Sequence, residues 1–131
     1  MKKIELEIKL DWSEMDLFGH INNVAYFKYA QSASVNYLEE VGINTADPEN
    51  KHSFAVANSS CQFKAPLFFP GTIKVITTTD WIKNTSLQLS HKLYDQKNVL
   101  AAEITDVLVL FDYATQKKLL ISDEIKSKIQ G

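Results

Sequence analysis

A short stretch near the N-terminus holds the side chains best suited to chemistry. Asp16 supplies a carboxylate, Gly19 permits backbone conformations that other residues avoid, and His20 is a second titratable group. Asn22 and Asn23 follow, and either can cap the start of a helix. The free amides and the dipole of a helix start favour a developing negative charge. An acid beside such amides can hydrolyse an activated carbonyl: the carboxylate attacks it or deprotonates a water, while the Asn23 amide stabilises the oxyanion.

Asp16 also has a purely structural interpretation, because an aspartate in a turn often accepts hydrogen bonds from nearby backbone amides. Taken alone, Asp16 fits that interpretation better than a catalytic one. Its neighbours favour chemistry instead. His20 stands where an apolar residue would suit a simple hydrophobic staple, and the amides of residues 21–24 are expected to be free at the helix start.

The elements that position this stretch can be predicted from the hydrophobic pattern. Apolar and charged residues alternate over residues 3–12, which predicts a strand with one buried face. A helix is predicted from Asn22 or Asn23 to about Val41, and Gly42 is placed to end it. The apolar or small residues expected on its inner face are Phe27, Ala30, Ser34, Leu38 and Val41.

The rest of the chain is predicted to be mainly β. A polar loop over 44–52 precedes predicted strands at 53–64, 72–82, 86–94 and 99–111, with a hairpin turn at 95–98 and a short helix at 122–130 capped by Ser122. One long helix against one antiparallel sheet is an α+β layout. We expect a single domain over residues 1–131, and a homodimer that covers the open sheet edge and face.

Composition narrows the possible partners. The formal net charge is −2 and all 14 basic residues are lysines, so neither nucleic acid nor an acidic membrane surface is an expected partner. The single cysteine, Cys61, excludes an intramolecular disulfide and suits a reducing compartment. Residues 2–10 alternate instead of forming the apolar core of a secretory signal, and no apolar run reaches the ~20 residues needed to span a bilayer. We therefore expect a cytoplasmic protein.

Other reactive side chains lack the context that they need. The histidines lie on different predicted elements without ligand spacing, so no metal site is expected. His91 fits a strand residue. Cys61 is expected to be a buried core residue, because nothing local would activate its thiol. The serines at 32, 59 and 60 lack the G-x-S-x-G turn of a serine hydrolase.

The run from Glu14 to Tyr26 resembles the signature D-x-D-x-x-G-H-x-N-N-x-x-Y of the 4-hydroxybenzoyl-CoA thioesterase-like family, with Glu14 in place of the commoner aspartate. Weaker similarities at 63–71, 81–86 and 107–112 extend the resemblance over roughly residues 4–115. The family has the hotdog fold, in which an antiparallel sheet wraps a long central helix. The predicted order of elements agrees with that fold.

The resemblance implies roles for individual residues. Asp16 falls on the catalytic carboxylate, as nucleophile or general base, and Asn23 falls where a helix-start amide polarises the thioester carbonyl. His20 and Asn22 match positions that hold the loop and Asp16 in place. The remaining matches, expected to contact the substrate, are Gly19, Tyr26 as an aromatic at the site wall, and Ser86, which falls near a serine that reaches the site from a neighbouring subunit. Phe18 is bulkier than many residues at its position, so a narrowed acyl pocket is expected.

The sequence therefore predicts an acyl-CoA thioesterase that releases a carboxylic acid and free CoA. Coenzyme A would enter as part of the substrate, and no further cofactor is expected. Two alternatives stay open: a thioesterase acting on acyl carrier protein (ACP), and a non-catalytic hotdog protein that binds acyl thioesters. The acyl group cannot be inferred from the sequence, and a homotetramer is as compatible with it as a homodimer.

Overall fold

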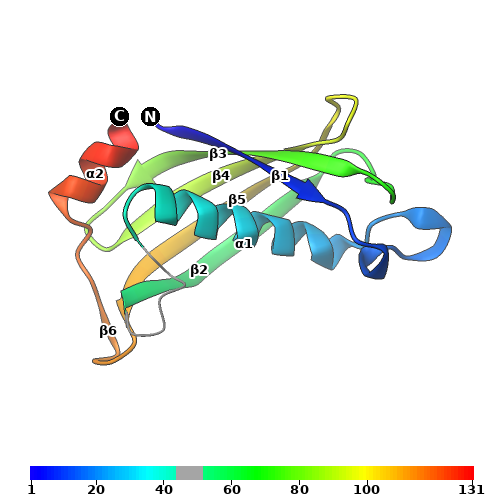
Figure 1. Ribbon diagram of the computed structural model, residues 1–131. Coiled ribbons are helices and arrows are strands. Elements are labelled where there is room, and N and C mark those ends of the chain that lie inside the picture. The colour runs from blue at the N-terminus through cyan, green and yellow to red at the C-terminus, as the bar shows by residue number, and fades with distance from the viewer. Residues whose placement is uncertain (44–51) are drawn as a thin grey trace.

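The computed structural model describes residues 1–43 and 52–131, so most of the predicted 44–52 loop lies outside the described residues. A long helix, α1 (Asn23–Glu40), lies across one face of an antiparallel sheet (Figure 1). The larger strands are β1 (Lys3–Lys9), β2 (His52–Phe63), β3 (Thr72–Ile82), β4 (Ser86–Tyr94) and β5 (Leu100–Asp112). A short C-terminal helix, α2 (Asp123–Gln130), ends beside the N-terminus, where the Lys2 amide donates to the Ile129 carbonyl at 2.6 Å.

The ends of α1 follow from local chemistry. Asn22 is the N-cap, and its side-chain oxygen accepts a hydrogen bond from the Ala25 amide at 2.9 Å. At the other end Gly42 takes a φ of 100°, a left-handed conformation that glycine adopts without steric cost. The expected helix and both of its end signals are confirmed.

The sheet order is β1-β3-β4-β5-β2, with every pairing antiparallel. β5 lies between β4 and β2, as its long apolar run predicts. The sequence did not predict β6 (Lys117–Lys118), a two-residue strand that pairs with the end of β5. The edge strands of the main path are β1 and β2, and β2 runs along one side of α1.

The core lies between α1 and the sheet. The helix buries Tyr29, Ala30, Ala33, Tyr37 and Leu38 against alternate residues of the central strands. Phe27 was predicted to lie on this face but is 38% exposed, because the buried stripe of α1 runs through Tyr26 and Ala30 and leaves Phe27 at the rim beside β2. The prediction was therefore wrong to place Phe27 on the buried face of α1, but it gave the correct orientation of the helix.

Candidate active site

The loop between β1 and α1 carries Asp16 and is closed by short-range main-chain bonds. The Asp16 amide donates to the His20 carbonyl at 2.6 Å, and Met15 and Ile21 form an isolated antiparallel bridge. The loop contains two short 3-10 turns, Trp12–Glu14 and Leu17–Gly19. Asp16 therefore stands between two tight turns, and its backbone is fixed from both sides.

Glu14 fastens this loop to α1. Its side chain is buried and accepts hydrogen bonds from the Tyr29 hydroxyl at 2.7 Å and the Lys28 ammonium at 2.8 Å. The Asp11 amide adds a third at 3.2 Å. Burial alone would raise the pKa of Glu14, but these donors together hold the pKa below its usual value. Burial and the nearby carboxylate raise the pKa of Tyr29, which therefore remains a donor at neutral pH.

Asn22 joins the loop to the helix through both polar atoms of its side-chain amide. Its Oδ1 caps α1, while its Nδ2 donates to the Glu14 carbonyl oxygen at 2.8 Å. The Asn22 main-chain amide donates to the same carbonyl at 2.9 Å. Asn22 is thus placed to hold the loop against the helix start.

A second segment, residues 66–70, supports the loop from the side of the sheet. The Ile21 amide donates to the Leu67 carbonyl at 2.8 Å, and the Phe69 amide donates to the Gly19 carbonyl at 2.9 Å. Gly19 has a φ of 78°, which explains the glycine at this position. The His20 ring packs edge-on against Phe68, with ring centroids 4.6 Å apart.

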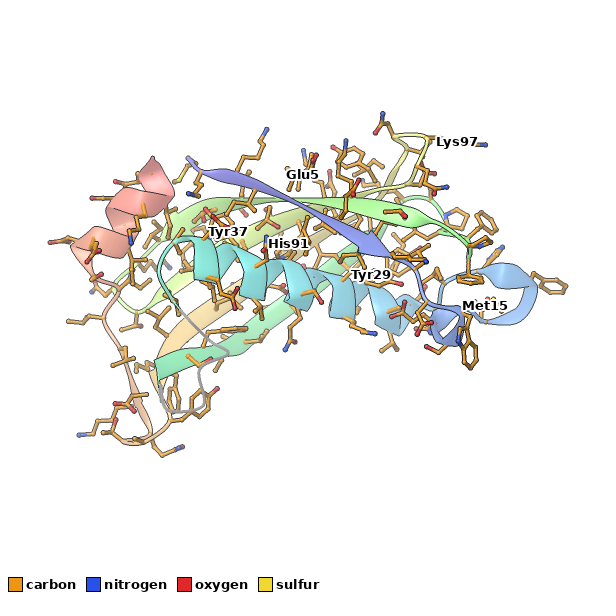
Figure 2. All side chains as sticks on the ribbon, viewed as in Figure 1. Glu5, Met15, Tyr29, Tyr37, His91 and Lys97 are labelled. Carbon is orange, nitrogen blue, oxygen red and sulfur yellow. The ribbon has the colours of Figure 1, made fainter. Side chains whose placement is uncertain are left out.

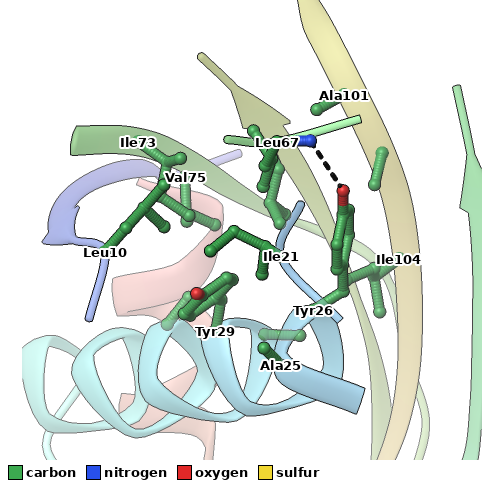
Figure 3. Packing of buried hydrophobic residues seen from close by; sticks show 14 residues of the cluster. Leu10, Ile21, Ala25, Tyr26, Tyr29, Leu67, Ile73, Val75, Ala101 and Ile104 are labelled. Carbon is green, nitrogen blue, oxygen red and sulfur yellow. Dashed lines mark hydrogen bonds between the residues drawn. The ribbon is translucent and has the colours of Figure 1, made fainter. Parts of the chain in front are cut away.

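Tyr26 links α1 to the same segment. Its hydroxyl oxygen accepts a hydrogen bond from the buried Leu67 amide at 3.1 Å (Figure 3). Its ring is buried in the core and lies 5.0 Å from the Phe63 ring, in an edge-on arrangement. The ring of Tyr26 therefore supplies an aromatic surface, and its hydroxyl satisfies a buried backbone donor.

These elements enclose a cavity of about 320 Å³ beside the start of α1. Four residues that the sequence singled out line it together: Asp16, His20, Asn23 and Tyr26. The Asp16 side chain is exposed and makes no capping bond to the turn that follows it. The structural interpretation of Asp16 as a turn-capping residue is therefore wrong, and its carboxylate is available to a ligand in the cavity.

The amides at the helix start divide into two groups. Those of Ile21 and Asn22 are occupied by the Leu67 and Glu14 carbonyls, which corrects the expectation that all four amides of residues 21–24 are free. The amides of Asn23 and Val24 have no hydrogen-bond acceptor among the residues that the structure describes. The oxyanion donor expected from the sequence is thus one of the two amides left open.

Other predicted residues lie elsewhere. Ser86 begins β4, where it pairs with Val109, and it does not line the cavity of its own chain. Phe18 is 92% exposed and does not line the cavity, which corrects the expectation that it narrows the pocket. Sequence reasoning gave no role to Phe63, the last residue of β2, or to Lys64, which follows it, and both line the cavity.

The remaining reactive residues are held inside the fold. Cys61 is half-buried against the core, and burial raises the pKa of its thiol, which disfavours the thiolate. His91 is a strand residue, as expected, and is fully buried. In residues 1–43 and 52–131 no group of three or more His, Cys, Asp or Glu side chains is arranged to hold a metal ion. Neither described helix is long and apolar enough to cross a membrane.

A long helix wrapped by one antiparallel sheet, with an acid-bearing loop at the start of the helix, defines a hotdog-fold protein. The family comparison is equally definite. The chain belongs to the thioesterase-like superfamily, whose model matches residues 10–129, and is a thioester hydrolase.

Individual relatives share this fold at low sequence identity. The long-chain acyl-CoA thioesterase FadM of Escherichia coli is 20% identical over 128 residues, which cover 97% of each chain. The acyl-acyl carrier protein thioesterase ATL2 of Arabidopsis thaliana is 29% identical over 107 residues, 79% of this chain but only 57% of that protein. The PA2801 protein of Pseudomonas aeruginosa superposes with a TM-score of 0.86 at 27% identity, over 95% of this chain and 96% of its own.

Proposed function

We propose that this protein hydrolyses an acyl-CoA thioester to a carboxylic acid and CoA, with Asp16 as the reacting carboxylate. The observation that carries the proposal is the cavity at the start of α1. It is lined by Asp16, which is exposed, and by Asn23; among the residues that the structure describes, neither the Asp16 carboxylate nor the Asn23 amide has a hydrogen-bond partner. An acid and an oxyanion donor on one cavity wall are the two groups that acyl transfer to water requires.

Each residue has a chemical task in this mechanism. The thioester carbonyl oxygen accepts a hydrogen bond from the Asn23 amide, which strengthens as the oxygen becomes negative. As a general base, Asp16 takes a proton from water while the water oxygen bonds to the carbonyl carbon. As a nucleophile, Asp16 bonds to that carbon itself and forms an anhydride that water then cleaves. In both routes the carbon–sulfur bond breaks and the thiolate leaves as CoA.

The supporting residues explain why Asp16 stays in place. Glu14 and Asn22 fasten its loop to α1, and Gly19 and His20 bind the 66–70 segment. Tyr26 and Phe63 offer aromatic surface for the acyl group, and Lys64 offers a cation at the wall of the cavity. A lysine in this place suits a phosphate of CoA as a point charge.

The carrier of the acyl group is the main alternative. FadM supports CoA and ATL2 supports an acyl carrier protein, and both are distant relatives. We favour CoA because the match to FadM extends along almost the whole of both chains. The kcat/KM values for one acyl group presented on CoA and on acyl carrier protein would decide between them. A non-catalytic binding protein would bind CoA thioesters without turnover.

The assembly is proposed on physical grounds. β2 is an edge strand whose segment from Val56 to Ser60 is exposed, and such an edge needs cover. The family resemblance implies that, in a homodimer or homotetramer, Ser86 of a neighbouring subunit reaches the site. Light scattering of the purified protein measures the oligomer. A single domain, a reaction that needs no resident cofactor or metal, and a cytoplasmic location stay predictions.

Substitution of Asp16 tests the mechanism directly. We expect Asp16→Asn and Asp16→Ala to lower kcat by roughly 10²–10⁴-fold with an unchanged circular dichroism spectrum. Asp11→Asn is the matched control, because Asp11 is an exposed acid of the same loop that does not line the cavity. Near-normal hydrolysis by both Asp16 variants would contradict the proposal.

Single-turnover hydrolysis in ¹⁸O-labelled water detects a nucleophilic role of Asp16 when the label appears on the enzyme. A general base directs labelled oxygen into the acid product in the first turnover. A nucleophile whose anhydride is opened at the Asp16 carbonyl leaves the label on the enzyme, where mass spectrometry of the peptide that contains Asp16 detects it.

A further inference from the structure

The sheet face that packs against α1 is mainly apolar but carries a row of buried polar side chains. Most residues that point inward from β3, β4 and β5 are Leu, Ile, Val or Ala. Thr77, His91 and Asp106 interrupt this pattern on successive strands, and they are 1%, 0% and 5% exposed. Figure 2 shows His91 near the middle of α1. Burying an acid and an imidazole where aliphatic neighbours pack well is costly unless every group is bonded.

The row forms one continuous network. The Thr77 hydroxyl lies 2.8 Å from His91 Nδ1, and the His91 Nε2 lies 3.3 Å from an Asp106 carboxylate oxygen. Ser34 of α1 approaches the same Nε2 at 3.1 Å. The second Asp106 oxygen accepts a hydrogen bond of 2.6 Å from Ser59 of β2. Because Ser34 and Asp106 share one ring nitrogen, the group lacks the geometry of a Ser-His-Asp triad, in which the acid and the serine use opposite nitrogens.

One end of the network opens into a hollow of about 200 Å³ between α1 and β2. Ser34, Ser59 and Asp106 of the network line it, and Gln31 adds a further polar side chain. The remaining lining residues are Phe27, Phe54 and Val56. A cavity of about 150 Å³ is enough for a benzene ring, so the hollow can hold the end of an acyl group.

A β-bulge brings these residues of β2 to the same side. Val56 pairs with Leu108 but Asn58 pairs with Val107, so Ala57 is an extra residue in the ladder. Without that extra residue, side-chain alternation would turn Phe54 and Val56 away from the face that Ser59 occupies. With it, Phe54, Val56 and Ser59 all line the hollow.

The hollow lies next to the candidate active site along α1 and β2. Tyr26 lines the active-site cavity and Phe27, the next residue of the helix, lines the hollow. On β2, Phe63 lines the cavity, and Ser59, on the same face of the strand, lines the hollow. Asn23 and Ser34 are eleven residues apart on α1, a distance of about 17 Å at 1.5 Å per residue.

We propose that this hollow is the distal acyl subsite and that Asp106 selects an acyl chain carrying a hydroxyl group near its far end. The inference rests on the proposed thioester hydrolysis at Asp16 and specifies the substrate class of that site. The chain would follow α1 from the Asn23 amide past Phe27, which requires roughly ten to fourteen carbons.

A hydroxyl is the ligand group that best fits the polar residues of the hollow. A carboxylate has about four acceptor positions and no proton to donate, and Ser59 and His91 leave some of those positions open. A ligand hydroxyl can donate to Asp106 and accept from Gln31 or Ser34, which line the same hollow. An unsubstituted chain would displace water from the carboxylate without replacing its hydrogen bond. A terminal carboxylate would be repelled by Asp106.

The test compares matched pairs of substrates. The kcat/KM of ω-hydroxyacyl-CoAs of roughly eight to fourteen carbons is divided by that of the unsubstituted acyl-CoA of equal length. We expect a ratio of tenfold or more at the best length, which corresponds to about 1.4 kcal/mol. Ser59→Ala and Asp106→Asn should lower the ratio towards one, and Asp106→Leu should reverse it.

Controls cover the risk that a variant at Asp106 fails to fold. Ser59 and Val56 are exposed in the single chain, so Ser59→Ala and Val56→Trp are expected to fold. Because both residues lie on the β2 edge that is proposed to pair between subunits, light scattering of each variant checks that its oligomeric state is unchanged. Val56→Trp should fill the hollow and shift the preferred chain to shorter lengths. Ser60→Ala is the matched control: Ser60 lies on the opposite face of β2 and bonds to Thr105 at 2.8 Å, so its removal should leave the ratio unchanged.

The outcomes separate this inference from the proposed function. Hydrolysis that depends on Asp16, with equal kcat/KM for both members of every pair, overturns the subsite and leaves the thioesterase intact. A Val56→Trp variant that changes only the oligomeric state would show that a second copy of the chain fills the hollow, which also overturns it. Absence of hydrolysis with every acyl-CoA overturns both proposals.

Discussion

Replacing Glu14 by glutamine removes one negative charge from the loop that carries Asp16 and preserves the shape of the side chain. Glu14 is 7% exposed and accepts hydrogen bonds from the Tyr29 hydroxyl, the Lys28 ammonium and the Asp11 amide. Glutamine can still accept from the Tyr29 hydroxyl through its single oxygen, whereas its amide group repels the Lys28 donor. We therefore expect the fold to survive and the attachment of the loop to α1 to weaken.

The expected loss follows from the kind of hydrogen bond at each partner. A hydrogen bond to a charged group contributes about 1.5–3 kcal/mol and a neutral one about 0.5–1.5 kcal/mol. The bond from buried Tyr29 therefore loses about 1 kcal/mol, and the bond from the Asp11 amide weakens further. Lys28 is 67% exposed, so solvent and salt screen its contribution. A total of about 1–2 kcal/mol lowers the Tm of a domain of this size by roughly 3–6 °C.

The pH dependence gives the difference between wild type and Glu14→Gln a definite sign. The pKa of Glu14 in the folded protein is lower than its ordinary value of 4.5, so folding favours the ionised carboxylate. The extra stability of the wild type is therefore fully present above pH 4.5 and is lost as the pH falls through the folded pKa. The other carboxylates titrate equally in both proteins, so their contributions cancel in the difference between the two unfolding free energies.

Urea unfolding of the two proteins at neutral pH and at a pH of about 3.5 measures this difference, and thioester hydrolysis measures its effect on the loop. Since a misplacement of about 1 Å can cost about 10²-fold in rate, we expect kcat to fall roughly tenfold with a smaller change in KM. Glu14→Asp should recover part of the rate, and Lys28→Gln should have little effect. Equal unfolding free energies at neutral pH, or a Lys28→Gln loss as large as that of Glu14→Gln, would refute the reasoning.

Two further substitutions test the supports of the loop. Asn22→Ala removes the cap of α1 and the bond to the Glu14 carbonyl, so we expect a loss of about 1–2 kcal/mol in urea unfolding and a lower kcat. Ser122→Ala, which removes only the cap of α2, should lower stability without changing kcat. Tyr26→Phe leaves the buried Leu67 amide without its acceptor and should cost about 1–3 kcal/mol. By contrast, Tyr113→Phe, at an exposed hydroxyl that donates to Phe54, should change the unfolding free energy by less than about 0.5 kcal/mol.

Local signals in the sequence were enough to predict the helix and the larger strands. Asn22, Gly42 and Ser122 each stand at a helix end where their conformational preference requires them. Alternation over residues 3–9 and 86–94 gave strands with the correct buried faces. These patterns depend on neighbours in the sequence, so no tertiary contact was needed to recognise them.

The sequence predicted the site residues within the motif itself, but it did not predict the contacts that these residues make when the chain folds. Asp16, His20, Asn23 and Tyr26 line one cavity as the motif indicated. The partners of Glu14 are Lys28 and Tyr29, which become neighbours only when the loop folds back on the helix. The same folding occupies the Asn22 amide, and the 66–70 segment occupies the Ile21 amide, which no helix-start rule could foresee.

The buried network could not be predicted for a different reason. The alternating pattern of a strand predicts which face of the sheet a residue occupies, but not which residues of the other strands it contacts. His91 and Asp106 occupy regular inward positions of β4 and β5, and their contact depends on the register between those strands. Ser59 reaches Asp106 only because the extra residue at Ala57 changes the phase of β2. A one-residue slip would turn Ser59 outward, so that the hollow and the active-site cavity would no longer share the inner face of β2. The bulge, more than any single side chain, therefore decides that both open along the same side of α1.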